Sequence, residues 1–253
     1  MAETTPTVTV RSYVLLVLGS LGYFGFLFVW FILPAFLSPV IAELGISNTA
    51  AGVLTGAIPL IYIPLSLTSG LVVDRIGSRR AIGIGLVLLG IAGGVRGWAP
   101  GFPSMLALTL LVGVGGTGIT FGLPKLVSDL FPPERSGTMS SVYLIGSYLG
   151  TAAAFGIGRP YLGPWLGGWR EAFLWSGFAV AVFGVVWFLV SARTAGVEHL
   201  AGTDEEESFS VGSIKADAVA VIGHRGLRRL VVVGTMSLFV LHGLQAWLAT
   251  VLE

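Results

Sequence analysis

Long uncharged runs, mostly apolar, set the pattern of this chain. From one charged residue to the next, seven such runs cover residues 12–42, 44–73, 81–95, 97–124, 136–158, 172–192 and 230–252. Six of them reach the roughly 20 residues that a helix needs to cross the hydrocarbon core of a bilayer. The run 81–95 is short, but it spans if Arg80 and Arg96 extend to opposite interfaces. The runs do not alternate every second residue as the strands of a membrane barrel do. The pattern therefore predicts a polytopic helical membrane protein with helices at 12–37, 49–73, 79–98, 104–123, 137–158, 171–191 and 230–252.

Composition supports this class and excludes others. Of the 253 residues, 54% are hydrophobic and 11% are charged, against roughly 25% charged in a soluble domain. The net charge of +1 gives no reason to expect a nucleic-acid partner, and the lack of cysteine excludes disulfides and thiolate metal sites. The three histidines are scattered along the chain, with no nucleophile–base pair or metal cluster. We expect no enzyme activity, no cofactor and no metal.

Lysine and arginine give the orientation. Eleven of the fourteen fall on the side of the N-terminus and three, Arg96, Arg159 and Arg170, fall on the other side. By the positive-inside rule, the N-terminus and the charged stretch near residues 192–229 lie in the cytoplasm. We expect the cell membrane as the location.

The order of the runs predicts three parts. Residues 1–191 would form a six-helix bundle, 192–229 a cytoplasmic linker that contains "GTDEEES", and 230–253 a seventh helix that begins a second bundle. The alternative is a complete seven-helix protein. A retinal protein would need a lysine in its last helix, but the only lysines are Lys125 and Lys215. A receptor that begins outside the cell would contradict the charge count.

The segment "GLVVDRIGSRR", residues 70–80, concentrates charge between the second and third helices. Gly77 is able to take the positive φ that a tight reversal requires, and Gly70 lets another helix approach closely. Asp74 lies at the unfavourable end of its own helix dipole and should find an arginine or the N-terminus of a neighbouring helix. Arg79 and Arg80 would meet anionic headgroups.

This segment resembles the signature loop of the major facilitator superfamily, G-x-L-a-D-r-x-G-r-r-r, with Val72 for the usual leucine and Ser78 at one basic position. The positions that match it are Gly70, Asp74, Arg75, Gly77, Arg79 and Arg80. The resemblance covers the chain as the N-terminal half of a twelve-helix transporter plus the first helix of its second half. It implies two inverted three-helix repeats, substrate bound between the halves, and a loop that gates by contacting the opposite half. The missing C-terminal half would belong to the same chain or to a second one.

Softer similarities concern the branch of the family and its coupling. The stretches "FGLPKLVSDLFPPERSGTMSSVY" and "GGWREAF" are similar to cyanate, nitrate and nitroimidazole permeases. In "TLLVGVGGTG", Thr109 stands where many proton-coupled members carry an arginine. That puts proton coupling through this position in doubt and favours a packing role for the glycines.

The placement of charge favours a small anion as substrate. No carboxylate lies in the interior of the first six helices, and the charges nearest the bilayer are basic: Arg96, Lys125 and Arg159. Charge in the apolar region costs a few kcal/mol, so a cation that lines a cavity should meet an anion there. Extension of each side chain to the interface is the alternative.

Aromatic and polar side chains complete the candidate cavity. Tyr23 and Trp30 lie on the aromatic-rich first helix, and His242 and Gln245 share a face of the seventh. Packing and an ordinary interhelical hydrogen bond are the alternatives. The sequence thus predicts a secondary active transporter for a small solute, preferably an anion, that works by alternating access. Drug or metabolite efflux and a non-transporting half-length membrane subunit are the other candidate functions.

Overall fold

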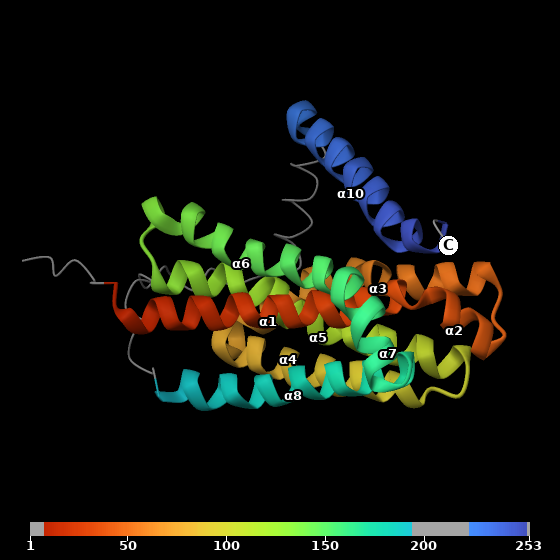
Figure 1. Ribbon diagram of the computed structural model, residues 1–253. Coiled ribbons are helices and arrows are strands. Elements are labelled where there is room, and N and C mark those ends of the chain that lie inside the picture. The colour runs from red at the N-terminus through yellow and green to blue at the C-terminus, as the bar shows by residue number, and fades with distance from the viewer. Residues whose placement is uncertain (1–7, 194–222, 252–253) are drawn as a thin grey trace, which may run out of the picture. The chain divides into compact units, whose positions relative to one another are not determined.

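The computed structural model describes residues 8–193 and 223–251, and all regular elements in these ranges are helices (Figure 1). The chain divides into two compact units, Met1–Leu200 and Ala201–Glu253. The predicted all-α class is confirmed. Most of the predicted linker, residues 194–222, lies outside the described residues.

Ten helical elements form the described part of the first unit. They are α1 (Val10–Ala35), α2 (Leu37–Leu44), α3 (Asn48–Ile76), α4 (Ser78–Val95), the 3₁₀ turn η1 (Arg96–Trp98), α5 (Phe102–Leu130), α6 (Pro133–Ala153), the wide π-type turns η2 (Ala154–Leu162), α7 (Gly163–Leu166) and α8 (Trp169–Arg193). Six stretches are long and apolar enough to cross a membrane: Val10–Ala35, Asn48–Ser66, Ser78–Trp98, Phe102–Leu130, Pro133–Leu166 and Trp169–Arg193. They correspond to the six helices predicted for the bundle.

The second unit contains α10 (Arg225–Val251). It covers the predicted seventh helix and begins about one turn before residue 230. Its crossing of the membrane stays a prediction.

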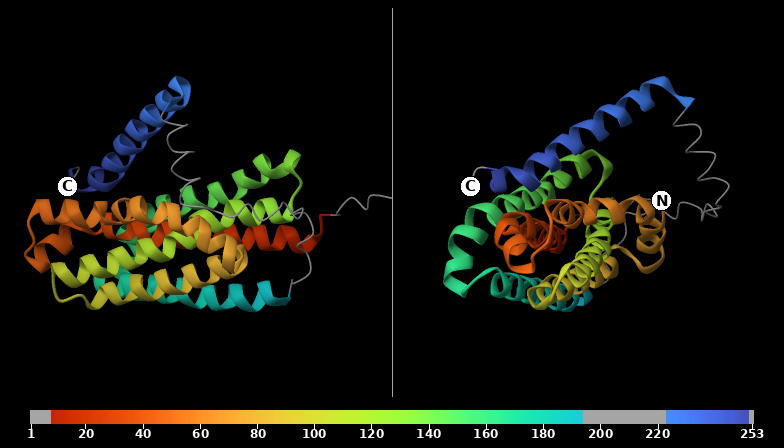
Figure 2. Two further views of the ribbon diagram at one scale, coloured as in Figure 1. Left: turned by 180° about the vertical axis from the view of Figure 1, so that it is seen from behind. Right: turned by 90° about the vertical axis from the view of Figure 1, so that its right-hand side faces the viewer.

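Helices of the first unit pack in pairs around α1. The most extensive contacts join α4 to α8, α4 to α5, α1 to α6 and α3 to α5. Figures 1 and 2 show α6 and α8 on opposite sides of α1. The centre of the bundle is filled by side chains with no exposed surface, among them Leu15, Val29, Leu86, Ile119 and Leu123.

Glycine allows the closest of these contacts. A Cβ built on Gly85 of α4 would lie 2.5 Å from the carbonyl oxygen of Gly115 of α5, and one built on Gly118 would lie 2.5 Å from that of Ala81. Because lipid gives helices no hydrophobic reason to associate, close backbone packing of this kind is a main source of their stability. The glycines of "TLLVGVGGTG" therefore pack helices together, as the sequence suggested.

Three helix boundaries differ clearly from the predicted ones. The fifth predicted helix continues through η2 and α7 to Leu166, past its predicted end at residue 158. The chain turns at Phe36, two residues after Pro34 interrupts the hydrogen-bond ladder of α1, and α2 then continues to Leu44 instead of a loop. Helix α5 continues to Leu130, past the predicted end at residue 123. Its last turns carry Lys125, whose charge has a partner described below, so this charge does not end the helix.

Candidate functional site

A hairpin of one residue joins α3 to α4. Gly77 has φ +85°, its N–H donates to the Val73 carbonyl over 2.9 Å, and its own carbonyl accepts from the Ala81 N–H over 3.0 Å. Positive φ is strained for residues with a side chain. The turn predicted at Gly77 is therefore present, and the adjoining ends of α3 and α4 are called the hairpin end of the bundle below.

Two polar contacts tie the hairpin end to α5. Lys125 Nζ lies 3.0 Å from Asp74 Oδ1, and Ser78 Oγ donates to Asp129 Oδ2 over 2.9 Å. Lys125 and Asp129 are one turn apart on α5, so they face the hairpin together. The two ion-pair side chains keep 36% and 56% of their surface exposed, and an exposed pair of this kind contributes at most about 1 kcal/mol. The bond is weak enough to open and close readily.

The hairpin arginines point in different directions. Arg79 is buried against α8, where its Nη1 donates to the Ser191 carbonyl over 3.3 Å and its carbonyl accepts from Trp187 Nε1 over 2.8 Å. The expectation that Arg79 meets lipid headgroups is therefore wrong, because α4 turns this face toward α8. Arg75 and Arg80 are exposed. Gly70 has open space around it within the described bundle.

An aromatic patch with hydroxyl groups is shared by four helices. It consists of Tyr23 and Trp30 of α1, Tyr62 of α3, Tyr143 of α6 and Thr120 of α5. The Trp30 and Tyr62 ring centroids are 6.2 Å apart, those of Tyr23 and Tyr143 are 6.0 Å apart, and the hydroxyls of Tyr62 and Thr120 share a hydrogen bond of 3.1 Å. Of the five, only Tyr143 is buried, and the other four are half-buried.

The structure thus joins two predicted cavity residues, Tyr23 and Trp30, to three that sequence reasoning missed. The sequence offered one indication of these three: hydroxyl groups within apolar runs, at Tyr62, Thr120 and Tyr143. Gly116 makes room for the patch, since a Cβ there would lie 2.7 Å from the Tyr62 hydroxyl oxygen.

The predicted basic residues are scattered. Arg96 is fully buried inside the bundle, where it donates to the carbonyls of Val29 and Gly93 and lies 5.2 Å from the ring centroid of Phe173. Its Nη1 has no hydrogen-bond partner among the described residues. Arg159 lies partly exposed on η2.

His242 and Gln245 are part of α10, but their side chains lie outside the described set. In residues 8–193 and 223–251, no group of three or more His, Cys, Asp or Glu side chains is placed to hold a metal ion.

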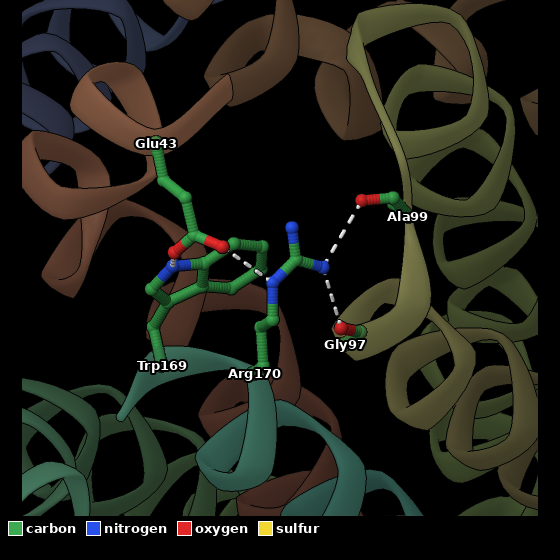
Figure 3. Close-up of polar contacts among 5 residues, drawn as sticks. All are labelled: Glu43, Gly97, Ala99, Trp169 and Arg170. Atoms are coloured by element: carbon green, nitrogen blue, oxygen red, sulfur yellow. Dashed lines mark hydrogen bonds and ion pairs between the residues drawn. The ribbon is translucent and has the colours of Figure 1, made fainter. Parts of the chain in front are cut away.

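A second polar network lies at the other end of the bundle, where α2 meets α8 (Figure 3). Glu43 accepts from Arg170 Nε over 2.7 Å and from Trp169 Nε1 over 2.6 Å, and Arg170 Nη1 donates to the carbonyls of Gly97 and Ala99 over 2.8 and 3.1 Å. We call these five residues the α2 latch. Hydrogen bonds from Arg170 and then Trp169 lower the pKa of Glu43 from its ordinary value. The stretch "GGWREAF" contains Trp169 and Arg170 of this network. Nothing in the sequence around Glu43 indicated that it would be their partner.

Comparison with known proteins gives one family. Residues 19–253 match the family model described as Major Facilitator Superfamily. Among curated relatives, the uncharacterized transporter YycB of Bacillus subtilis is 38% identical over 60% of this chain and 37% of its own length. The facilitated glucose transporter member 10 of Mus musculus is 30% identical over 81% and 39%. The nitrate/nitrite transporter NrtP of Nostoc punctiforme is 26% identical over 74% and 36%.

A solved structure agrees in fold. A bacterial homolog of the human lysosomal transporter Spinster, in an inward-facing and unoccupied conformation, has a TM-score of 0.75 and 20% identity, and the match covers 95% of this chain and 55% of that one. In the three relatives above, the match spans less than two fifths of the relative's length.

Proposed function

This chain belongs to the Major Facilitator Superfamily, and on that premise we propose that it forms the N-terminal half of a secondary active transporter for a small solute. The first bundle contains α1 to α8, and the seventh helix is α10, which begins at Arg225, within the predicted linker 192–229. The second half, in the same chain or another, closes the substrate site. The N-terminus and the hairpin end face the cytoplasm of the cell membrane, as the lysine and arginine count supports.

The observation that carries this proposal is the link between the hairpin and the aromatic patch along α5. Thr120, in the patch, and Lys125, bonded to Asp74, are five residues apart on the same helix. Motion of α5 relative to α3 therefore moves both Thr120 and Lys125. The Asp74–Lys125 pair then stabilises one of two states of the transporter, and its loss shifts the equilibrium between them.

A small anion is the substrate class that we propose. The nitrate/nitrite relative supports it, and the patch offers hydroxyl donors on aromatic walls with no carboxylate among its five residues. Arg159 and groups of the second half would supply positive charge. Arg96 is left out of the proposed site because its guanidinium is enclosed by the bundle, and Lys125 acts in the gate rather than on substrate.

Uptake into vesicles that contain the full-length protein tests both the class and the patch. We expect uptake of nitrate but not of glucose. Tyr62→Phe removes one hydroxyl and keeps the ring, so we expect KM to rise by about tenfold or more, because a hydrogen bond to a charged group contributes about 1.5–3 kcal/mol. Tyr161→Phe is the matched control, since Tyr161 is 68% exposed on η2 and belongs to neither network.

Two results would contradict the proposal. Uptake of glucose but not of nitrate would show that the substrate is a neutral sugar and not an anion. An unchanged KM in the Tyr62→Phe variant would remove the patch from the substrate site.

A further inference from the structure

An apolar groove opens between α3, α4 and α5 toward the hairpin end. Its volume is about 230 Å³, and no charged side chain lines it. Val72 and Ile84 form the rim and are 50% and 52% exposed, while Gly115 and Gly118 of α5 lie at the floor. The α4 and α5 walls of the groove belong to stretches that are apolar enough to cross a membrane, Ser78–Trp98 and Phe102–Leu130. An apolar occupant therefore suits the groove.

Two cations stand at the hairpin end of this groove. Arg75 directly precedes the lining residue Ile76 on α3, and Arg80 directly precedes the lining residue Ala81 on α4, so both arginines lie beside the end of the groove. Both are exposed, and neither forms a salt bridge within the described ranges. Guanidinium groups bind phosphate through paired hydrogen bonds, so the two arginines are suited to an anionic phosphate at this end of the groove.

The opposite face of α3 is the better surface for another helix. At about 100° per residue, Gly56 and Gly70 both lie about 160° from Val72 around the helix. A Cβ on either glycine would meet nothing within 4 Å. Membrane helices approach one another closely at such small residues, whereas branched side chains form the rim of the groove. The glycine face therefore suits the second half, and the groove stays open to lipid.

We propose that the groove binds one anionic phospholipid, with an acyl chain between α3 and α4 and the phosphate between Arg75 and Arg80. The charge complementarity of this end of the groove selects an anionic headgroup over a zwitterionic one. This binding does not depend on transport, so it is measured without a substrate.

Native mass spectrometry of the full-length protein with added phosphatidylglycerol or phosphatidylcholine tests the proposal. We expect one phosphatidylglycerol to stay bound and phosphatidylcholine to bind several-fold more weakly. The double variant Arg75→Gln/Arg80→Gln should lose the preference for phosphatidylglycerol, because it removes both guanidinium groups from the headgroup. Ile84→Trp should lower retention several-fold by filling the groove, and this exposed position tolerates a larger side chain. Arg135→Gln, an exposed arginine on α6, and Leu144→Trp, at an apolar position 41% exposed on α6, are the matched controls.

Three results would overturn the proposal. Equal retention of phosphatidylglycerol by all variants would show that the lipid does not bind in the groove. Loss in the arginine variant without loss in Ile84→Trp would reduce it to surface charge. A photo-crosslinker at position 84 that captures another part of the protein instead of lipid would show that a protein segment fills the groove.

Discussion

Arg96 places a positive charge where the bundle has no exposed surface. Its guanidinium donates to the backbone carbonyls of Val29 and Gly93 and lies over the Phe173 ring. Its Nη1 has no hydrogen-bond partner in the described structure. A buried charge without full compensation costs several kcal/mol, and an apolar side chain of similar volume is often as stable or more so. The alkyl part of Arg96 is thus expected to contribute through packing and its charge to contribute little.

We expect Arg96→Met to leave the thermal unfolding midpoint unchanged or raised. Arg96→Ala should lower the free energy of unfolding by about 2–5 kcal/mol, because it leaves a cavity. Thermal unfolding of the purified protein in detergent measures both. If Met destabilises as much as Ala, the charge itself is required at this position.

Single residues also mark the limit of sequence reasoning about the site. Gly77 was predictable because a one-residue reversal between two helices calls for positive φ. For Asp74 we predicted an arginine or the N-terminus of a neighbouring helix, but its partner is Lys125. This pairing depends on α5 lying beside α3, which no local sequence pattern indicates. Arg96 follows an apolar run and so resembled an interfacial cation, but the turn η1 directs it inward. Charge position along the chain predicts depth in the membrane and leaves the direction of the side chain open.

Helix α2 shows how an element held by few contacts depends on ionisation. It follows the break at Phe36 and is joined to η1 and α8 through Glu43 and Arg170. The depressed pKa of Glu43 means that its ionised form is stabilised by folding. This contribution is complete above the ordinary value of 4.5 and is lost as the pH falls through the lower pKa of the folded state.

We therefore expect Glu43→Gln to lower the unfolding midpoint at pH 7, with a difference from the native protein that disappears as the pH falls from 4.5 through the lowered pKa of Glu43. Thermal unfolding across this pH range measures it. Glu171→Gln is the matched control, an exposed carboxylate in the first turn of α8. A difference that persists at low pH would show that the carboxylate charge is not what holds the latch.

The elements themselves were largely readable from the sequence, because hydrophobic length in a membrane has few alternatives. Two of the errors have local causes. Pro34 ends α1 close to the predicted residue 37, but α2 follows where a loop was predicted, and Lys125 was given the role of a helix end although Asp74 compensates its charge. Glycine contacts such as that of Gly85 with Gly115 determine which helices pair. The glycines in the sequence indicated close packing but not which helix each one contacts.

At the scale of the whole molecule, the hairpin contacts connect one bundle to the proposed cycle. The Asp74–Lys125 pair joins α3 to α5 inside this bundle, so it reports the relative position of two helices that both contribute to the aromatic patch. Because the pair is exposed, it contributes at most about 1 kcal/mol, which corresponds to roughly a fivefold change in the ratio of two states. A contact of this size adjusts the rate of alternation without deciding whether substrate binds.

We expect Asp74→Asn to lower the transport rate by up to about fivefold, with KM within about twofold of the native value. Lys125→Gln should have the same effect, and the double variant should be no slower than either single one, because all three lose one contact. Vesicle uptake at several substrate concentrations measures the rate and KM together. Glu134→Gln, an exposed carboxylate in the first turn of α6, is the control and should transport normally. Effects that multiply in the double variant would mean that Asp74 and Lys125 act on different partners, and a rise in KM alone would move Lys125 from the gate to the substrate.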